Sequence, residues 1–139
     1  MMKRHFKSKN DNGEKFQFEL VGPNEQNNQW FYRVQDPECE DFFEFKVEDF
    51  DENYVRIDTM TNHGKHEYKN KGIPEYLIPI VAKELNKKIL SSVEDARPIR
   101  AEFRTPDAEK FWKRMVTKNK AIYHEKKDRY EFTSDEILD

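Results

Sequence analysis

The sequence predicts an α+β fold, in which a mixed, mainly antiparallel central sheet of six to seven strands carries two main helices. Apolar and polar residues alternate through much of the first half, which is typical of half-buried strands. In the second half the apolar spacing changes to that of amphipathic helices. The connections between the early strands are short and therefore favour antiparallel pairing.

The length of 139 residues suits one domain and is short for two. Hydrophobic residues make up 35% of the chain and charged residues 38%, so the core must be compact. Aromatic residues compensate, because each of the 11 Phe, 6 Tyr and 2 Trp can bury a large area. We therefore expect a single domain over residues 1–139, with residues 134–139 as a flexible tail.

The composition also bounds the location of the protein. Cys39 is the only cysteine, which excludes an intramolecular disulfide. The sequence has no apolar run near 18 residues and no apolar stretch of the signal-peptide kind at its start. We expect a cytoplasmic protein without a membrane partner.

Four strands are expected in the first half, each bounded by a turn signal. Their ranges are 15–21, 30–35, 43–47 and 54–60. Gly22-Pro23-Asn24 ends the first strand and Asp36-Pro37 ends the second. Asp51-Glu52-Asn53 forms the turn into the fourth.

The first helix is expected over residues 73–85, because Ile73, Leu77 and Val81 fall on one face. Pro74 suits the first helical turn, whereas Pro79 predicts either a kink or a later start. Residues 89–92 form the next expected strand. A strand, a helix and a strand in this order predict a parallel pair with a right-handed crossover.

The second helix is expected to begin at Pro106, with Thr105 as its N-cap. Trp112 lies on its apolar face. Residues 121–124 and 129–133 then form a closing hairpin around a charged turn.

The candidate binding residues lie between the fourth strand and the first helix. They are Lys69, Asn70, Lys71, Gly72, Ile73 and Pro74. Glycine lets the backbone turn closely around a phosphate, and the N–H groups of a first helical turn are unsatisfied. Lys69 and Lys71 add positive charge. The segment therefore predicts an anion-binding helix start.

This segment resembles the motif of GNAT-type N-acetyltransferases, which reads a basic or amide residue, two spacers, Gly, any residue, then Gly or Ala. Lys69 and Gly72 occupy the first two defining positions, and Pro74 stands at the third. The resemblance implies an acyl-CoA N-acyltransferase-like fold with acetyl-CoA as co-substrate. It also implies that the six residues from Lys69 to Pro74 hold the coenzyme A pyrophosphate.

A second segment extends the resemblance to residues 54–132. Residues 105–112 are similar to the GNAT helix that usually reads Asn, two spacers, Ala, three spacers, then Tyr. Trp112 stands where the family commonly has the tyrosine that protonates the leaving thiolate. An indole cannot donate that proton.

Acetyl transfer needs a base for the acceptor amine and an acid for the leaving group. Asp58 is the predicted base, with Glu48 as a second candidate, and Tyr123 is the predicted acid, with Tyr130 as a second candidate. The structural alternative for the two acidic residues is a solvated position on a strand face. For the two tyrosines it is aromatic packing in the closing hairpin.

The leading hypothesis is an acetyl-CoA-dependent N-acetyltransferase that acts on an unidentified amine. The amine belongs either to a small molecule or to a protein, and a homodimer is an expected assembly of the chain. Residues 36–58 carry ten acidic against two basic residues, which suits a cationic acceptor. The alternative is a catalytically inactive GNAT-fold binding protein, which Pro74 and Trp112 favour.

Two other hypotheses are disfavoured by the sequence. A nucleic-acid-binding module would stack bases on Trp112 or Phe103, but the net charge of −3 opposes phosphate contacts. Its basic residues would be Arg97, Arg100, Arg104, Lys113, Arg114, Lys118 and Lys120. His63 and His66 lack an evident third ligand, so no metal site is predicted.

Overall fold

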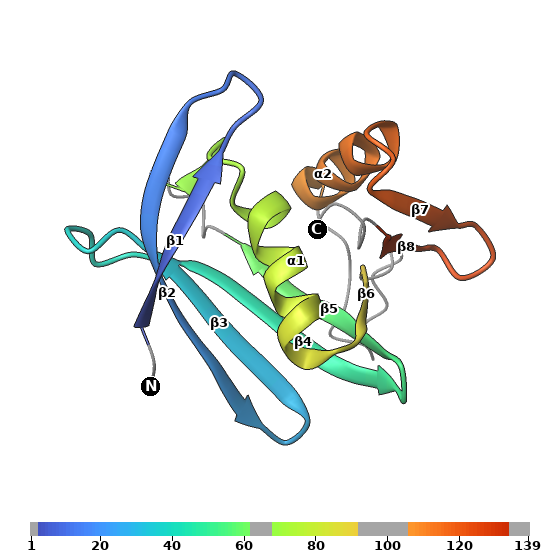
Figure 1. Ribbon diagram of the computed structural model, residues 1–139. Coiled ribbons are helices and arrows are strands. Elements are labelled where there is room, and N and C mark those ends of the chain that lie inside the picture. The colour runs from blue at the N-terminus through green and yellow to red at the C-terminus, as the bar shows by residue number, and fades with distance from the viewer. Residues whose placement is uncertain (1–2, 62–67, 92–105, 134–139) are drawn as a thin grey trace. The chain divides into compact units, whose positions relative to one another are not determined.

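The computed structural model describes residues 3–61, 68–91 and 106–133 (Figure 1). The described elements are, in chain order, β1 (Lys3–Lys9), β2 (Lys15–Gln26), β3 (Gln29–Gln35), β4 (Phe43–Asp51), β5 (Tyr54–Thr61), α1 (Ile73–Leu85), β6 (Lys88–Leu90), α2 (Pro106–Thr117), β7 (Ala121–His124) and β8 (Arg129–Phe132). The expected order of antiparallel strands, helix, strand, helix and hairpin is therefore confirmed. The expected tail at residues 134–139 lies outside the described residues.

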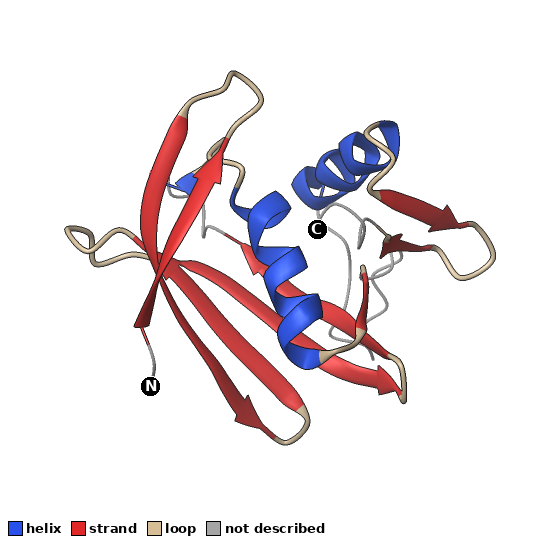
Figure 2. Ribbon diagram, in the orientation of Figure 1, coloured by secondary structure: helices blue, strands red, loops and turns tan. Residues whose placement is uncertain are grey.

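The eight strands form one hydrogen-bonded series, β1-β2-β3-β4-β5-β6-β8-β7, drawn in red in Figure 2. β1 with β2, β2 with β3, β6 with β8 and β7 with β8 are antiparallel pairs. β5 and β6 are parallel, in the register Tyr54 with Lys88 to Arg56 with Leu90, as the strand-helix-strand order predicts. The sheet is thus mixed and mostly antiparallel, with more strands than the six to seven expected.

The chain divides into two compact units. The first unit comprises Met1–Val47 and Thr59–Ile78, and the second comprises Glu48–Asp58 and Pro79–Asp139. β4, β5 and α1 each continue from one unit into the other.

β1 is the additional strand, and it belongs to the first unit. Its seven residues, KRHFKSK, include a single apolar side chain, so the alternation that marks a half-buried strand is absent from the sequence. Phe6 nevertheless pairs with Phe18 of β2, and both are buried. Cross-strand pairing with an apolar neighbour therefore defines this strand.

β2 corrects the expected strand end at Gly22-Pro23-Asn24. The strand continues to Gln26, with a register shift between Val21 and Asn24. Gly22 has φ = 121°, and a Cβ atom there would lie 2.5 Å from the Phe31 carbonyl oxygen. A glycine at this position permits a bulge where a bulkier residue would stop the pairing.

α1 begins at Ile73, with Pro74 in its first turn as predicted. It runs through Pro79, so the alternative of a later start is wrong. Ile73, Leu77 and Val81 are completely buried, which confirms the expected apolar face. None of the helices formed by the described residues has the length and apolar character needed to cross a membrane.

α2 belongs to the second unit and begins at Pro106, as predicted. The expected N-cap, Thr105, lies outside the described residues. Trp112 is buried and stacks on Tyr130 of β8, with 5.7 Å between ring centroids and 10° between ring planes. The helix is thereby packed against the closing hairpin, whose two strands lie where the sequence predicts them.

The end of β6 is fastened to β8 through Ser91. Its N–H donates to the Tyr130 carbonyl at 2.8 Å, and its Oγ accepts from the Tyr130 N–H at 2.8 Å. The buried Arg129 guanidinium donates to the Ser91 carbonyl at 2.9 Å. These bonds extend the pairing between the two strands beyond the end of β6. β6 itself ends at Leu90, two residues before the end of the expected strand, 89–92.

Replacing Trp112 with alanine is expected to lower the free energy of unfolding by about 3–5 kcal/mol, because it removes a fully buried ring from the α2–hairpin core. Chemical denaturation measures this change. Lys113→Ala is the matched control on the exposed face of the same helix and should change stability by no more than about 0.5 kcal/mol. Equal effects of the two substitutions would contradict the assigned packing of Trp112.

Candidate functional site

The predicted anion-binding segment lies in the first unit, between β5 and α1. Lys69 and Asn70 are exposed, and Lys71 and Gly72 are partly buried. Ile73 is buried as the first residue of α1, with Pro74 partly exposed after it. The six residues therefore form a loop that leads directly into a helix N-terminus.

Tyr68 holds the beginning of this loop. Its ring is buried and lies 5.9 Å from the Phe18 ring. Its hydroxyl accepts a hydrogen bond from the Asp36 N–H at 3.1 Å and donates one to the Asp41 carbonyl. Because Asp36 and Asp41 flank the turn between β3 and β4, Tyr68 ties the chain to that turn directly before the loop.

The β1–β2 hairpin holds the middle of the loop. The Ser8 hydroxyl donates to the Lys71 carbonyl at 2.7 Å, and Ser8 is buried. The Asn10 side-chain amide donates to the Asn70 carbonyl at 3.3 Å. Two consecutive loop carbonyls are therefore directed at the hairpin.

These bonds determine where the loop N–H groups point. In a trans peptide the N–H is directed opposite to the carbonyl of the same peptide unit. Since the Asn70 and Lys71 carbonyls face the hairpin, the N–H groups of Lys71 and Gly72 face away from it. Two successive N–H groups that point away from the hairpin, next to a positive φ of 57° at Asn70, make a local concentration of hydrogen-bond donors.

The loop also carries two lysines. Lys69 is exposed, and the Lys71 ammonium lies 4.4 Å from the centroid of the Phe16 ring, on the side of the β1–β2 hairpin. The first turn of α1 adds its unsatisfied N–H groups, except at Pro74, which has none. Glu75 in the same turn contributes one opposing charge.

Gly72 has a packing role that the motif alone does not reveal. Its φ is 73°, and a Cβ atom there would lie 2.1 Å from the Lys9 carbonyl oxygen. Contacts below 3.0 Å do not occur for real Cβ atoms, so the hairpin backbone would have to move. The glycine therefore permits direct backbone packing between loop and hairpin, besides any contact with an anion.

The predicted base, Asp58, lies on β5 in the second unit and is held by an arginine. Its carboxylate is 3.5 Å from Arg56, which also lies 3.3 Å from Glu48, the second candidate base. Asp58 keeps only 11% of its side chain exposed. The two candidate bases thus share one guanidinium.

The predicted acid, Tyr123, lies on β7 in the second unit and is 43% exposed. Its hydroxyl donates to Asp128 at 2.8 Å, and its ring lies 4.7 Å from the ring of Tyr130. Tyr130 is buried and donates its own hydroxyl to Glu109 of α2. Both tyrosines are therefore built into the α2–hairpin packing.

The sequence interpretation missed Ser8 and Asn10, which come from the unexpected hairpin. The Asn10-Asp11-Asn12-Gly13 run was the available signal, because such residues are typical of a tight turn between strands. Asn10 also uses its side-chain oxygen to accept from the N–H groups of Asn12 and Glu14, at 3.0 Å each. One residue thus organises the hairpin turn and contacts the loop.

Outside the loop, the described residues contain no group of three or more His, Cys, Asp or Glu side chains placed to hold a metal ion. His63 and His66 lie outside the described residues, as do Arg97, Arg100, Phe103 and Arg104 of the nucleic-acid hypothesis. Comparison with protein-family models, curated proteins and solved structures gave no match.

Gly72→Ala is expected to lower the free energy of unfolding by about 2–4 kcal/mol, because the new methyl group meets the Lys9 carbonyl and the positive φ is unfavourable for alanine. Gly13→Ala is the matched control. Its φ is 84°, but its Cβ would meet nothing within 4 Å, so only the conformational cost of about 1 kcal/mol remains. Denaturation curves that give both variants the same loss would contradict the loop–hairpin contact.

Proposed function

We propose that the protein binds acetyl-CoA through residues 69–74 and transfers its acetyl group to an amine, as an N-acetyltransferase of GNAT type. The observation that carries the proposal is the direction of the Lys71 and Gly72 N–H groups away from the hairpin, which follows from the Ser8 and Asn10 hydrogen bonds. The strand-helix-strand order of β5, α1 and β6, with β5 and β6 parallel, supports the proposal. In such units ligands bind at the turn between the first strand and the helix. The resemblance to the GNAT motif at Lys69 and Gly72 supports it further.

The residues present fit a pyrophosphate. A doubly charged group needs several donors and compensating charge, which two loop N–H groups and the ammonium groups of Lys69 and Lys71 supply. Pinning the loop carbonyls to the hairpin removes acceptors that would repel an anion. Because the donors are held in place before binding, little conformational entropy is lost when the anion binds.

The proposed reaction needs two proton transfers. When bound, acetyl-CoA supplies an acetyl group activated as a thioester. As the bond from the amine nitrogen to the acetyl carbon forms and the carbon–sulfur bond breaks, the amine loses a proton and the thiolate gains one. Asp58 is proposed to accept the first proton and Tyr123 to donate the second.

The second candidate function is a binding protein of the same fold that has lost catalysis. The burial of Trp112 against Tyr130 favours it, because this position packs the core where the GNAT helix commonly has a proton-donating tyrosine. The hydrogen bond of Tyr123 to Asp128 favours it as well, since that hydroxyl already has an acceptor. Under this alternative the loop binds the ligand and no acetyl group is transferred.

Acetyl-CoA is expected to bind with an affinity that falls about tenfold or more in the double variant Lys69→Gln, Lys71→Gln, because two charged contacts to phosphate are lost. Isothermal titration calorimetry measures the dissociation constant. The double variant Lys126→Gln, Lys127→Gln removes the same charge from the exposed β7–β8 turn and should bind normally. Absence of binding by the unmodified protein, or equal losses in the two double variants, would refute the loop assignment.

Tyr123→Phe is expected to leave acetyl-CoA affinity unchanged and to slow acetyl transfer by about 100-fold, because one proton donor is lost. Mass spectrometry of a panel of polyamines and lysine peptides incubated with acetyl-CoA measures the product. Tyr76→Phe, another exposed tyrosine, is the control and should retain full activity. Normal transfer by the Tyr123 variant would exclude this residue as the acid, whereas binding without any transfer by the unmodified protein would establish the second candidate function.

A further inference from the structure

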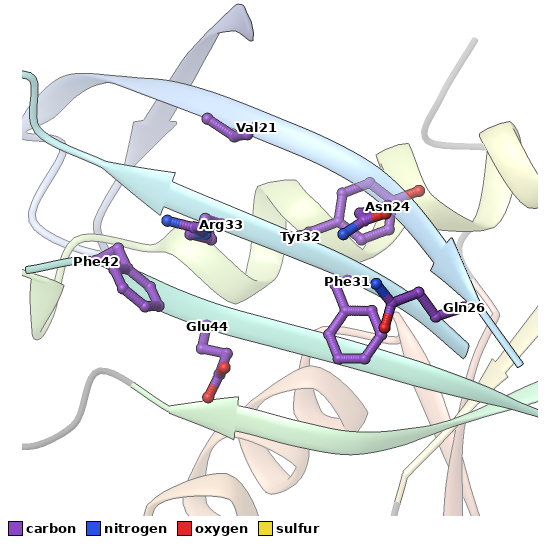
Figure 3. A pocket seen from close by; sticks show the side chains of 8 residues that line it. All are labelled: Val21, Asn24, Gln26, Phe31, Tyr32, Arg33, Phe42 and Glu44. Atoms are coloured by element: carbon purple, nitrogen blue, oxygen red, sulfur yellow. The ribbon is translucent and has the colours of Figure 1, made fainter. Parts of the chain in front are cut away.

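A hollow in the first unit is independent of the loop. It has a volume of about 530 Å³ and lies over β2, β3 and β4 (Figure 3). The lining residues that matter here are Val21, Asn24, Phe31, Arg33, Phe42 and Glu44. The volume falls within the range of small-molecule sites.

The hollow opens on the face of the sheet opposite to the buried core. Tyr32 and Val34 of β3 are buried, so the alternation of a strand places Phe31 and Arg33 on the other face. Figure 3 shows Phe31 and Arg33 on β3, with Phe42 and Glu44 at the beginning of the neighbouring β4. Side chains from adjacent strands thus converge on a common space.

The β2 bulge helps to create this space. It lies between Val21, which pairs with Arg33, and Asn24, which pairs with Phe31. Gly22 supplies no side chain at the bulge, and its backbone approaches the Phe31 carbonyl closely. Bulges that redirect side chains are frequent beside binding sites, and this one brings the Asn24 amide to the wall of the hollow.

The walls combine flat aromatic rings with cations. The Arg33 guanidinium lies 4.9 Å from the Phe42 ring centroid, and the Lys46 ammonium lies 5.4 Å from the Phe31 ring centroid. Lys3 is directly opposite Val21, which is directly opposite Arg33, so a third cation lies in the same row of the sheet. Of these three cations Arg33 lines the hollow itself, as does the carboxylate Glu44, and Lys3 and Lys46 lie on the neighbouring strands.

From this combination we propose that the hollow binds a nucleotide, either free or within a single strand. A planar base can stack on the Phe31 and Phe42 rings in place of the Lys46 ammonium and the Arg33 guanidinium that lie over them. The amides of Asn24 and Gln26 carry both donors and acceptors, which match the mixed donors and acceptors on a base edge. Arg33 presents the planar fork that binds phosphate oxygens, and Lys3 and Lys46 add positive charge.

The test is a titration of the ¹⁵N-labelled full chain, followed by amide NMR shifts at about 50 mM salt, where phosphate contacts are strong. The probes are AMP, GMP, CMP and UMP, and then five-nucleotide single strands of each base. At least one mononucleotide should shift the amides of β2, β3 and β4 saturably. If an oligonucleotide binds more tightly than its mononucleotide, the ligand is a nucleotide within a single strand. If the two bind equally, the ligand is a free nucleotide.

Variants link the binding to the hollow. Arg33→Gln and Phe31→Leu should each weaken binding about tenfold or more while keeping the melting temperature near that of the unmodified protein. Lys126→Gln is the matched control for the loss of one positive charge. Lys69→Gln, Lys71→Gln should leave this binding intact, which separates the hollow from a coenzyme A nucleotide bound at the loop.

Two outcomes would overturn the proposal. One is the absence of saturable shifts with every nucleotide and oligonucleotide at millimolar concentration. The other is binding that survives in both Arg33→Gln and Phe31→Leu but is lost in Lys69→Gln, Lys71→Gln.

Discussion

The approach of the Gly72 backbone to the Lys9 carbonyl is the constraint on which the first unit depends. Only a residue without a side chain, at a positive φ, lets the β1–β2 hairpin and the loop before α1 meet backbone to backbone. The Ser8 and Asn10 hydrogen bonds join the same hairpin to the same loop. They direct the loop N–H groups away from the hairpin. The donor geometry of the proposed anion site therefore rests on a single glycine and a strand of mostly polar residues.

The same sheet also separates two kinds of chemistry by face. Ser8 and Phe18 are buried side chains of the inner face, and they contact the loop residues Lys71 and Tyr68. Phe31 and Arg33 lie on the outer face, where the hollow is. Because strand alternation sends neighbouring residues to opposite faces, substitutions on the outer face need not alter the loop. Two glycines permit close backbone approaches in this unit. Gly72 approaches the Lys9 carbonyl, and Gly22, at the β2 bulge, approaches the Phe31 carbonyl.

Local pattern was sufficient for much of the fold and insufficient for the site. Alternation and helical spacing located β3, β5 and both helices, since each of these buries its own apolar face. The closing hairpin was located by its charged turn, and all four residues of β8 are buried. β1 could not be found this way, because Phe6 is its single apolar residue and its burial depends on pairing with β2. The position of the loop was predictable from Lys69 and Gly72. Its support was not, because Ser8 is 63 residues away from Lys71 and no periodicity relates them.

Binding and catalysis make different demands on such a chain. The proposed anion binding at the loop would use backbone N–H groups and two lysines, and its donor geometry depends on the contact with the hairpin. Proton transfer needs side chains with a particular hydrogen-bonding capacity, and these are already engaged: Asp58 with Arg56, and Tyr123 with Asp128. For transfer to occur, each of these bonds must be exchanged for one to the reacting groups, at a cost of about 0.5–1.5 kcal/mol for a typical bond and more for a charged one. That cost falls on the rate of transfer and not on ligand affinity, so a chain of this design can lose catalysis while it keeps binding.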